Sequence, residues 1–481
     1  MTTKPDEESL EYIFHPRSVA IIGIPSDPTH PMASVLFEPF FELEFDGELY
    51  PVNPKGGELR SLKIYPSLKE IPGPVDYVIV AIPAPATPKL MEECVAKGVK
   101  AALFVTAGFS EMGTEEGKRL EDGIIQIARE GGCRILGPNC FGIYCPKTKL
   151  SSGLGFPREC GNVGFISQSG GSYFYTVRAA ASRGVRFSKA ISYGNACDLN
   201  ESDFLEYFIK DPDTEIITAY IEGVKEGQRF LKALKEAAKV KPVIVHKGGY
   251  TEAGVKTAAS HTGSLAGEDA IWGAVFEQTG VIRVYSMDEL VDVILSFLYM
   301  SPSKGRNAAV LGAGGGASVQ VADECERAGL HVPKPPPEVL EKLKEFTPEA
   351  GSILGNPLDS QLSFWDPRKF GDSVKIFANW EGIDLMILHL GMYSGPSPQM
   401  HMASMEARRE AYISSAKECD KPVAIVLHSV VPSTESWEIV EKWQHRCNEA
   451  GFPFYPSTGR AANAISKFIK YYEDRMKEGG N

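Results

Sequence analysis

The chain has 481 residues, of which 43% are hydrophobic and 23% are charged, and this composition excludes a mainly disordered, collagen-like or coiled-coil protein. Its length is sufficient for about three domains. The 50 Lys and Arg residues against 62 Asp and Glu residues give a formal charge of -12, which argues against a general coat of nucleic acid or anionic membrane, so any anionic ligand has to be bound locally.

Nine cysteines are scattered along the chain without a C-x-x-C pair. This pattern favours neither a disulfide framework nor a zinc knuckle, and it fits a reducing compartment. The segment Met1–Phe14 is acidic and lacks the apolar core of a signal peptide, and the sequence contains no apolar run of about 18 residues. We therefore expect a soluble, cytoplasmic protein.

Short β-rich runs alternate with longer amphipathic stretches along almost the whole chain, a pattern typical of parallel sheets with crossover helices. The fold class expected is therefore α/β. The strands predicted in the first third are Ser18–Gly23, Glu48–Val52, Tyr77–Ile82, Ala101–Thr106 and Arg134–Leu136, each ending in a Gly, Pro or Asn turn. They predict a Rossmann-like sheet.

A polar, glycine-rich stretch over Lys147–Asn162 precedes a second set of strands, and the breaker Ser301–Gly305 precedes a third. The second set comprises Val163–Ile166, Ser188–Ser192, Glu215–Ile221 and Pro242–His246, and a helix over Met287–Leu298 follows. The third comprises Ala308–Leu311, Leu385–Leu390, Pro422–Leu427 and Pro453–Tyr455. Both sets begin with a strand, a glycine-rich turn and a helix, which suggests structural duplication. The predicted domains are residues 10–148, 149–300 and 306–478.

Several enzyme classes lack their motifs. The sequence has no P-loop, no H-E-x-x-H and no G-x-S-x-G. The first strand runs into Gly23-Ile-Pro-Ser26 instead of G-x-G-x-x-G, and the second runs into Asn53 where an NAD enzyme would normally present Asp or Glu to the ribose. An NAD-dependent dehydrogenase is therefore disfavoured.

Three loops follow strands of the first sheet, at the edge where open α/β sheets bind ligands. In Asn53-Pro-Lys-Gly-Gly57, Lys55 and the flexible backbone NH groups can hold a phosphate, although an ordinary turn with a solvated lysine explains the segment equally well. Gly137-Pro-Asn-Cys140 can aim Asn139 into the same crevice. Thr106-Ala-Gly-Phe109 is a similar turn, and either loop alone is weak support for a site.

The segment Ser167-Gln-Ser-Gly-Gly171 joins a buried strand to a helix. Its exposed NH groups and the positive end of the helix dipole converge on one point, which suits a phosphate. We therefore assign phosphate binding to Ser167, Ser169, Gly170 and Gly171. The alternative is simple capping of the helix by Ser169.

His261 lies among small residues in Thr257–Gly267, so its ring has no bulky partner to pack on it. The strand ending at Ile221 delivers Glu222 to the edge of the same sheet, where its carboxylate can accept an imidazole NH and leave the other nitrogen nucleophilic. Lys247, after the fourth strand of this set, can supply positive charge near His261. Structural roles for each of these three residues remain the alternative.

These segments, in this order, resemble the α-subunit of NDP-forming acyl-CoA synthetases, the family of ADP-forming acetyl-CoA synthetase, whose first two domains are also those of succinyl-CoA synthetase α. The matching stretches are His15–Gly23, Tyr50–Gly57, Thr106–Phe109, Gly137–Cys140, Phe165–Gly170, Tyr220–Gly223, Ala258–Gly267 and Asn356–Asp359. The turn Gly23-Ile-Pro25 departs from the family's usual Gly-Ala-Ser, and Ala313–Ala317 departs from its usual Asn-Ala-Gly-Gly-Pro.

The resemblance implies a Rossmann-like CoA-binding domain followed by two flavodoxin-like, succinyl-CoA synthetase-like domains. It implies an acid–thiol ligase that converts acyl-CoA, ADP and phosphate reversibly to carboxylate, CoA and ATP through an acyl phosphate and a phosphohistidine. His261 matches the phosphorylated residue and Glu222 its stabilising carboxylate. The residues expected to face CoA are Gly23, Ser26, Asn53, Lys55, Ile82 and Asn139.

No stretch resembles the family's ATP-grasp nucleotide domain. The resemblance therefore implies a separate ATP-grasp β-subunit that holds ADP or ATP with Mg, in an α2β2 complex, and no metal is expected on this chain. Two alternatives stay open. One is a non-catalytic CoA-binding or regulatory module of the same fold, and the other is a nicotinamide oxidoreductase.

Overall fold

The computed structural model describes residues 7–25, 27, 29–262, 268–347, 353–359, 366–391, 410–428 and 434–479. The chain forms two compact units. Unit 1 comprises Met1–Ala181 and Val185–Leu290, and unit 2 comprises Ser182–Gly184 and Val291–Asn481. Within the described ranges, none of the helices has the length and apolar character needed to cross a membrane.

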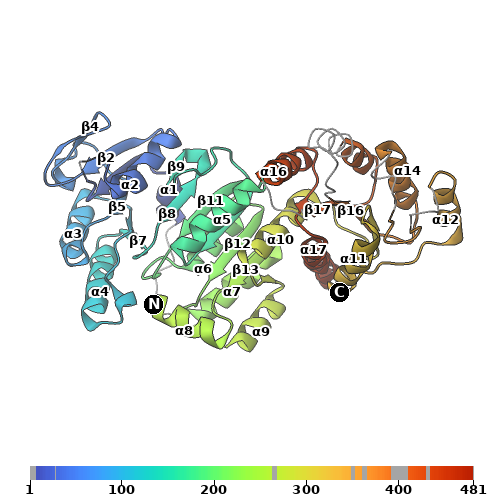
Figure 1. The fold of residues 1–481 in the computed structure, drawn as a ribbon. Coiled ribbons are helices and arrows are strands. Elements are labelled where there is room, and N and C mark those ends of the chain that lie inside the picture. The colour runs from blue at the N-terminus through green and yellow to red at the C-terminus, as the bar shows by residue number, and fades with distance from the viewer. Residues whose placement is uncertain are drawn as a thin grey trace. The chain divides into compact units, whose positions relative to one another are not determined.

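The first sheet of unit 1 is five-stranded and parallel, in the order β2-β1-β5-β6-β7. It lies in the part of the chain coloured blue to cyan, with β2, β5 and β7 labelled (Figure 1). Its strands are β1 (Ser18–Ile22), β2 (Glu48–Val52), β5 (Tyr77–Val80), β6 (Ala101–Phe104) and β7 (Arg134–Leu136). Around it lie α1 (Glu7–Phe14), α2 (Pro31–Glu42), η1 (Leu68–Glu70), η2 (Ala84–Ala86), α3 (Thr87–Lys97), η3 (Ser110–Met112) and α4 (Glu115–Glu130), and the hairpin β3 (Gly57–Leu59) and β4 (Leu62–Ile64).

Successive residues of β1 alternate between two hydrophobic layers. Val19 packs in a cluster that includes Phe37 of α2, whereas Ala20 packs in a cluster that includes Met91 of α3. Both faces of the sheet are covered, as expected when crossover helices lie on both sides. The chain leaves β1 for β2 on one side and then for β5 on the other, so the point where ligands bind in such sheets is the carboxyl edge of β1 and β5.

The second sheet of unit 1 has seven strands in the order β14-β13-β12-β10-β11-β8-β9. The strands are β8 (Gly142–Cys145), β9 (Leu150–Ser151), β10 (Val163–Ser167), β11 (Phe187–Ser192), β12 (Ile216–Ile221), β13 (Val243–Lys247) and β14 (Ile282–Val284). The associated helices are η4 (Pro146–Thr148), α5 (Gly170–Ser182), α6 (Glu201–Lys210), α7 (Gly227–Val240), α8 (Glu252–Thr262) and α9 (Asp269–Thr279). Helix α10 (Met287–Tyr299) follows β14, and its residues from Val291 onward belong to unit 2.

Strands β10 to β14 are parallel, and β8 and β9 add an antiparallel edge. One face of the parallel strands packs on Phe204 of α6, Phe230 of α7 and Trp272 of α9. Strand β10 lies between β11 and β12, so the direction of chain progression reverses there. The carboxyl edge of β10 and β12 is therefore the second place in unit 1 where the topology favours a ligand.

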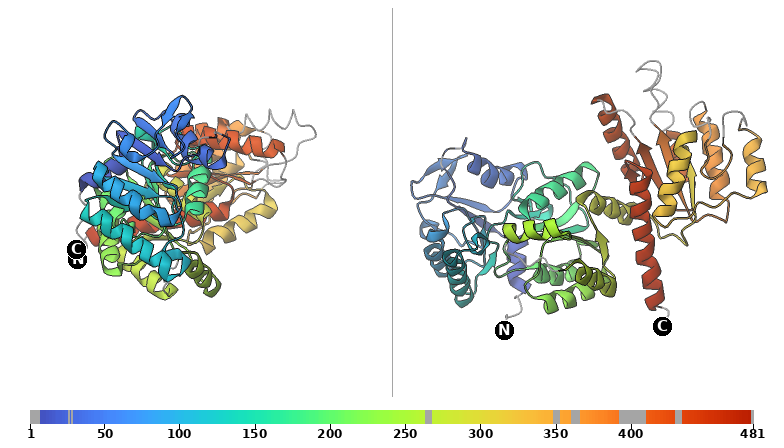
Figure 2. Two further views of the ribbon diagram at one scale, coloured as in Figure 1. Left: turned by 90° about the vertical axis from the view of Figure 1, so that its left-hand side faces the viewer. Right: turned by 60° about the horizontal axis from the view of Figure 1, so that its bottom comes forward.

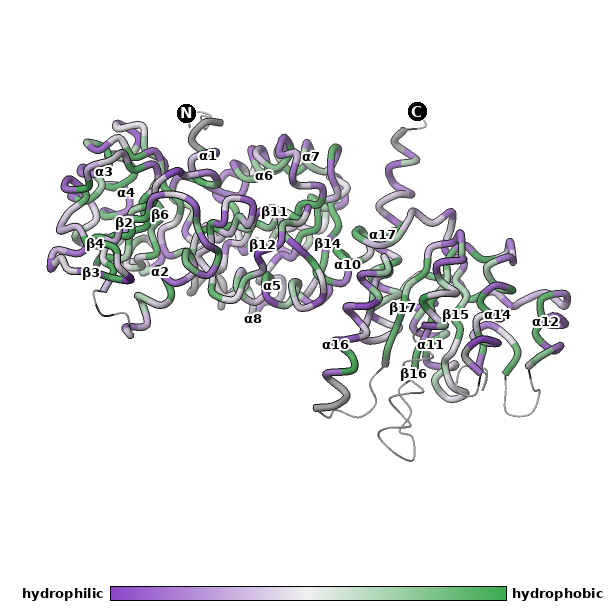
Figure 3. The backbone as a smooth tube through the Cα atoms, turned by 90° about the horizontal axis from the view of Figure 1, so that it is seen from above, coloured by the Kyte–Doolittle hydropathy of each residue, from purple (hydrophilic) through white to green (hydrophobic). Residues whose placement is uncertain are grey.

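Unit 2 contains a parallel sheet in the order β15-β16-β17-β18. The strands are β15 (Ala308–Leu311), β16 (Leu385–Gly391), β17 (Val423–His428) and β18 (Phe454–Tyr455), and the helices are α11 (Gly315–Arg327), α12 (Pro337–Lys344), α14 (Pro367–Ala378), a helix over 410–417, α16 (Thr434–Glu449) and α17 (Thr458–Gly479). The strands are hydrophobic along most of their length (Figure 3), and α17 forms a long helix beside the sheet (Figure 2).

The α/β class predicted from the sequence is confirmed, and each predicted strand is present within one or two residues. The prediction omitted β8, β9, β14 and the β3–β4 hairpin. These strands have two to four residues, too short for a recognisable run of alternating or apolar residues. Strand β8 lies within the predicted first domain, residues 10–148, but it pairs with β11 of the second sheet. The three domain boundaries stay a prediction.

Candidate active site

Residues predicted to bind CoA lie at the carboxyl ends of β1 and β2. Gly23 has φ +89°, and a Cβ atom there would lie 2.5 Å from the Ala81 carbonyl oxygen, so this position requires glycine. The Asn53 amide donates to the Ile24 carbonyl over 2.9 Å, and its oxygen accepts the Lys55 NH over 2.9 Å. Asn53 therefore ties the two loops together, while the Lys55 side chain is exposed.

Ile82 and Asn139 lie on the same edge and are linked through Thr106. The Thr106 hydroxyl donates to the Ile82 carbonyl over 2.8 Å, and the Thr106 carbonyl accepts the Asn139 NH over 3.0 Å. The loops after β5, β6 and β7 are thus joined in one row. Ser26, predicted for the same site, lies outside the described residues.

The turn that contains Asn139 contacts the loop after β11 of the second sheet. Gly137–Pro138 is a cis peptide, and Asn139 has φ +56°. A Cβ atom on Gly194 would lie 2.2 Å from the Pro138 carbonyl oxygen, which also accepts the Asn195 NH over 2.9 Å. A side chain at position 194 would push the two loops apart, so Gly194 allows the edges of the two sheets to meet.

Asn195 also joins two carboxylates on elements that follow β6 of the first sheet, Glu111 of η3 and Glu121 of α4. Its amide nitrogen donates to Glu111 over 2.5 Å and to Glu121 over 3.1 Å, and the backbone NH groups of Gly108 and Phe109 donate to Glu111 over 2.6 and 3.1 Å. Burial alone would raise the pKa of Glu111, but these hydrogen bonds outweigh it and lower the pKa. The ionised carboxylate therefore fixes the loop after β6 to the loop after β11.

The predicted phosphate turn connects β10 to α5. The Ser167 hydroxyl donates to the Ser169 carbonyl over 2.7 Å, and the Ser169 hydroxyl accepts the Ser172 NH over 3.3 Å. Ser169 thus caps the helix, as the simpler interpretation proposed. The cap uses the NH of Ser172, whereas the first helical NH groups, at Gly170 and Gly171, have no acceptor within the helix because of helix geometry. Capping and anion binding are compatible here.

Gly170 permits a close approach between α5 and an aromatic ring. A Cβ atom at this position would lie 2.1 Å from the ring of Phe141, which is 37% exposed. The ring lies against the start of the helix, one residue before β8. Gly171, the next residue of the turn, is exposed.

Glu222 is held at the carboxyl end of β12 by two neighbours. The Gln168 side-chain oxygen accepts the NH groups of Glu222 and Gly223 over 2.7 and 3.0 Å, and the Tyr220 hydroxyl donates to the Glu222 carboxylate over 3.2 Å. Burial and the Glu222 charge raise the pKa of Tyr220, so its phenol stays protonated and can donate. Gln168 and Glu222 are both buried. The phosphate turn and Glu222 are therefore parts of one connected edge.

Lys247 is the last residue of β13, the strand next to β12, and it is 1% exposed. Its ammonium group donates to the Gly248 carbonyl and, over 3.4 Å, to the Gly249 carbonyl. The Trp272 ring of α9 lies 5.2 Å away. Burial lowers the pKa of Lys247 to about 8, although the negative charge of Glu222 acts in the opposite direction.

His261 belongs to α8, which begins at Glu252, five residues after β13 ends. The His261 side chain lies outside the described part of the structure, so its pairing with Glu222 stays a prediction. The helix itself contacts η3, the turn that carries Glu111 after β6 of the first sheet. Helix α8 therefore contacts a loop of the predicted CoA-binding sheet.

The structure thus groups the predicted residues along two facing edges. Gly23, Asn53, Ile82 and Asn139 lie on the first sheet, with Lys55 exposed beside them, and Ser167, Ser169, Gly170, Gly171 and Glu222 lie on the second. Sequence reasoning missed the contributions of Gln168, Tyr220 and Asn195. Gln168 and Tyr220 belong to motifs whose predicted roles rest on the neighbouring serines and glycines and on Glu222. Asn195 belongs to a glycine-containing turn, Tyr193-Gly-Asn-Ala196, for which the sequence predicts no role.

Comparison with protein families identifies two regions of the chain. Residues 17–146 match a CoA binding domain, and residues 160–297 match a succinyl-CoA ligase like flavodoxin domain. These regions contain the first sheet and most of the second.

Relatives and solved structures resemble the whole chain. The α-subunit of acetate–CoA ligase [ADP-forming] I of Pyrococcus furiosus is 35% identical over 480 residues, which are 98% of this chain and 99% of the relative. Acetate–CoA ligase [ADP-forming] I of Archaeoglobus fulgidus is 35% identical over 472 residues, which are 98% of this chain but 64% of that longer protein. The structure of the dinucleotide forming acetyl-coenzyme A synthetase 1 of Ca. Korarchaeum cryptofilum with phosphate and ADP matches with a TM-score of 0.81, 29% identity and 97% coverage of both chains.

Proposed function

The chain belongs to the family of ADP-forming acetate–CoA ligases, and from this premise we propose that it is the α-subunit of an ADP-forming acyl-CoA ligase. The reaction interconverts acyl-CoA, ADP and phosphate with carboxylate, CoA and ATP. Relatives named as α-subunits and a structural neighbour with phosphate and ADP bound support this assignment.

The part of the reaction assigned to this chain has two steps. A phosphate oxygen attacks the thioester carbonyl, the C–S bond breaks, and CoA leaves as a thiolate that takes up a proton. An imidazole nitrogen of His261 then attacks phosphorus, the bond between phosphorus and the acyl oxygen breaks, and the carboxylate leaves. Nucleophilic catalysis of this kind divides one difficult transfer into two easier ones.

The described residues supply the binding groups for these steps. The start of α5 offers the NH groups of Gly170 and Gly171 and the positive end of the helix dipole to a phosphate near Ser167 and Ser169. Glu222 is suited to hold the second imidazole nitrogen, because Gln168 and Tyr220 fix its position. CoA would lie along the edge formed by Gly23, Asn53, Ile82 and Asn139, with the exposed Lys55 beside it. Ser26 stays a predicted CoA contact from the sequence alone.

A partner subunit would complete the reaction. We assign the nucleotide to an ATP-grasp β-subunit that holds ADP with Mg²⁺, and the complex to an α2β2 assembly. The relative from Archaeoglobus fulgidus, which extends beyond the region matched by this chain, supports a nucleotide-handling part outside this chain. The Mg²⁺ ion would neutralise charge on the phosphates during transfer.

The observation that carries the proposal is the course of α8. This helix starts beside the edge that holds Glu222 and contacts η3 of the first sheet. A phosphoryl carrier on α8 would therefore lie near both the thioester site and the phosphate turn. In the sequence, His261 stands among small residues, a composition that suits a carrier which has to visit a second site on the partner.

The test is phosphoryl transfer to the purified chain. Incubation with acetyl phosphate labelled at phosphorus is expected to produce an acid-labile, base-stable label that is lost in His261→Ala and strongly reduced in Glu222→Gln. Lys256→Ala, an exposed position on the same helix, is the matched control and should keep the label. A wild-type chain that takes no label, with or without the β-subunit, would favour the non-catalytic module.

The acyl group can be tested separately. The names of the relatives make acetyl-CoA the first substrate to try. We expect phosphate-dependent CoA release from acetyl-CoA, and a panel of branched, aryl and dicarboxylic thioesters ranks the specificity. Release that does not depend on phosphate would indicate simple thioester hydrolysis and contradict the acyl phosphate route.

A further inference from the structure

Lys247 is a buried charge that the proposed reaction does not use. It is 1% exposed, and among the described residues it makes no ion pair. Its ammonium group instead donates to the carbonyls of Gly248 and Gly249 and lies 5.2 Å from the Trp272 ring. Because burying a lysine without a carboxylate partner is costly, the position of this charge calls for an explanation.

A short chain of contacts connects Lys247 to Glu222. The Lys247 ammonium group binds the Gly248 carbonyl. A Cβ atom on Gly248 would lie 2.5 Å from the Tyr220 hydroxyl, so the glycine backbone lies directly against that group. The Tyr220 hydroxyl in turn donates to the Glu222 carboxylate over 3.2 Å. A shift of the Gly248 turn would therefore displace the donor that orients Glu222.

The same turn also determines where α8 starts. Gly248 and Gly249 follow β13, and Gly249 has φ +71°. A Cβ atom on Gly254, in the first turn of α8, would lie 3.1 Å from the Gly249 Cα atom. The helix therefore packs on the turn that Lys247 holds, and the path of the chain toward His261 depends on it.

We propose that Lys247 is a positioning residue for the phosphoryl carrier, whose ammonium group holds the Gly248–Gly249 turn and provides positive charge at the edge where Glu222 lies. This inference rests on the proposed function, because its effect is read through His261. The acidic groups that act on Lys247 are Glu222 and Asp269, and Arg283 opposes them.

The proposal predicts a loss of function at alkaline pH. The pKa of Lys247, about 8 against an ordinary 10.5, leaves the ammonium group charged at neutral pH and removes the charge as the pH rises through about 8. The rate of labelling by acetyl phosphate should therefore fall over this range in the wild-type chain. In Lys247→Arg the charge persists, so the alkaline decline should move to higher pH.

The matched experiment compares Lys247→Met with Lys189→Met in the full-length chain. Lys189 is equally buried, in β11 of the same sheet, but it is ion-paired with Asp211. At neutral pH, labelling per folded molecule should be roughly tenfold to a hundredfold slower in Lys247→Met and unchanged in Lys189→Met. Folded protein is quantified by thermal unfolding and circular dichroism.

Three results would overturn the inference. The first is a labelling rate of Lys247→Met equal to that of the wild type. The second is a loss of labelling rate in Lys189→Met as large as that in Lys247→Met. The third is a labelling rate that declines over the same alkaline range in the wild type and in Lys247→Arg. If Lys247→Met does not fold, the wild-type profile alone decides, because a rate that stays constant from about pH 7 to about pH 9.5 excludes the proposed role. Absence of label in the wild type would instead refute the proposed function.

Discussion

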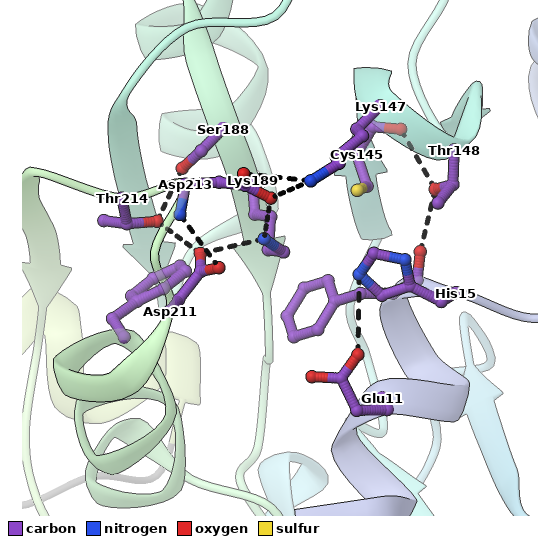
Figure 4. Close-up of polar contacts among 12 residues, drawn as sticks. Glu11, His15, Cys145, Lys147, Thr148, Ser188, Lys189, Asp211, Asp213 and Thr214 are labelled. Atoms are coloured by element: carbon purple, nitrogen blue, oxygen red, sulfur yellow. Dashed lines mark hydrogen bonds and ion pairs between the residues drawn. The ribbon is translucent and has the colours of Figure 1, made fainter.

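Two buried lysines lie at opposite ends of the second sheet of unit 1 and are stabilised in different ways. Lys189, aligned with Gly164 near the amino end of β10, pairs with Asp211 over 2.8 Å and Asp213 over 3.6 Å (Figure 4). Lys247, at the carboxyl end of β13, is held by backbone carbonyls and an aromatic ring. Each is 1% exposed. The difference therefore lies in the partners and not in the depth of burial.

The surroundings of Lys189 form a complete network. Asp211 also accepts the Thr214 hydroxyl over 2.6 Å, Thr214 contacts the Ser188 hydroxyl over 2.7 Å, and Lys147 binds Asp213 over 2.8 Å (Figure 4). A network of this kind suits a structural role, because each charge keeps the same partner. At the carboxyl end, Lys247 has backbone carbonyls and an aromatic ring as its neighbours, and such a charge suits the phosphoryl site that we propose there.

The largest effect is expected for Asp211→Asn at the amino end. The substitution removes the closer of the two carboxylate partners of Lys189 and leaves its ammonium group buried beside a neutral amide, with Asp213 at 3.6 Å. Loss of one member of a buried pair typically lowers the free energy of unfolding by about 3–5 kcal/mol. Urea unfolding measures this change, and labelling per folded molecule should stay at the wild-type level. A stable variant with impaired labelling would reverse the roles assigned to the two ends.

Gln168→Ala is expected to affect both stability and function at the carboxyl end. The NH groups of Glu222 and Gly223 lose their common acceptor, which costs about 1–3 kcal/mol of unfolding free energy. Labelling should slow by roughly tenfold or more because Glu222 is no longer fixed.

Gln168→Glu separates the two contributions of Gln168. Its carboxylate can accept the same NH groups, so most of the stability should return. The additional negative charge near Glu222 disfavours an approaching phosphate, so the labelling rate should not return. Equal recovery of stability and labelling would show that only the hydrogen bonds to the backbone matter.

Tyr220→Phe is a smaller change at the same edge. It removes the hydrogen bond to Glu222 and keeps the ring that packs edge-on against His246, with centroids 5.2 Å apart. The labelling rate should fall roughly fivefold, which corresponds to about 1 kcal/mol in the activation free energy of labelling. The melting temperature should change little. Unimpaired labelling would contradict the chain of contacts that links Lys247 to Glu222 through Tyr220.

The parts that the sequence predicted are those determined by local patterns. The buried apolar runs of β10 and β12 and the glycine-rich turn after Ser167 have clear signatures. The side chains that orient Glu222 could not be predicted in this way. Gln168 accepts the Glu222 NH from 54 residues earlier in the sequence, so this contact forms only when the sheet assembles. Tyr220 is only two residues from Glu222, but its hydroxyl donates to that carboxylate through a side-chain orientation that no local pattern indicates. Both are also common residue types without a diagnostic spacing.

The same limit applies to the two lysines. Lys189 follows Phe187 and Ser188 in its strand, Lys247 follows Val245 and His246, and neither sequence context indicates whether the charge is paired. Asp211, the partner of Lys189, follows α6 and precedes β12, so the pair forms only when the sheet assembles. Resemblance to a family supplied the roles predicted for His261 and Glu222, and the fold shows the surroundings of Glu222.

The smallest effect is expected for Lys147→Ala, which removes the shorter of the two lysine contacts to Asp213. The Lys147 side chain is 57% exposed, whereas that of Lys189 is 1% exposed, although their distances to Asp213 are 2.8 and 3.6 Å. Water screens the exposed pair and replaces the lost ammonium group, so no measurable change in melting temperature is expected. If the melting temperature of Lys147→Ala fell as far as that of Lys189→Met, contact distance and not burial would determine the strength of this network.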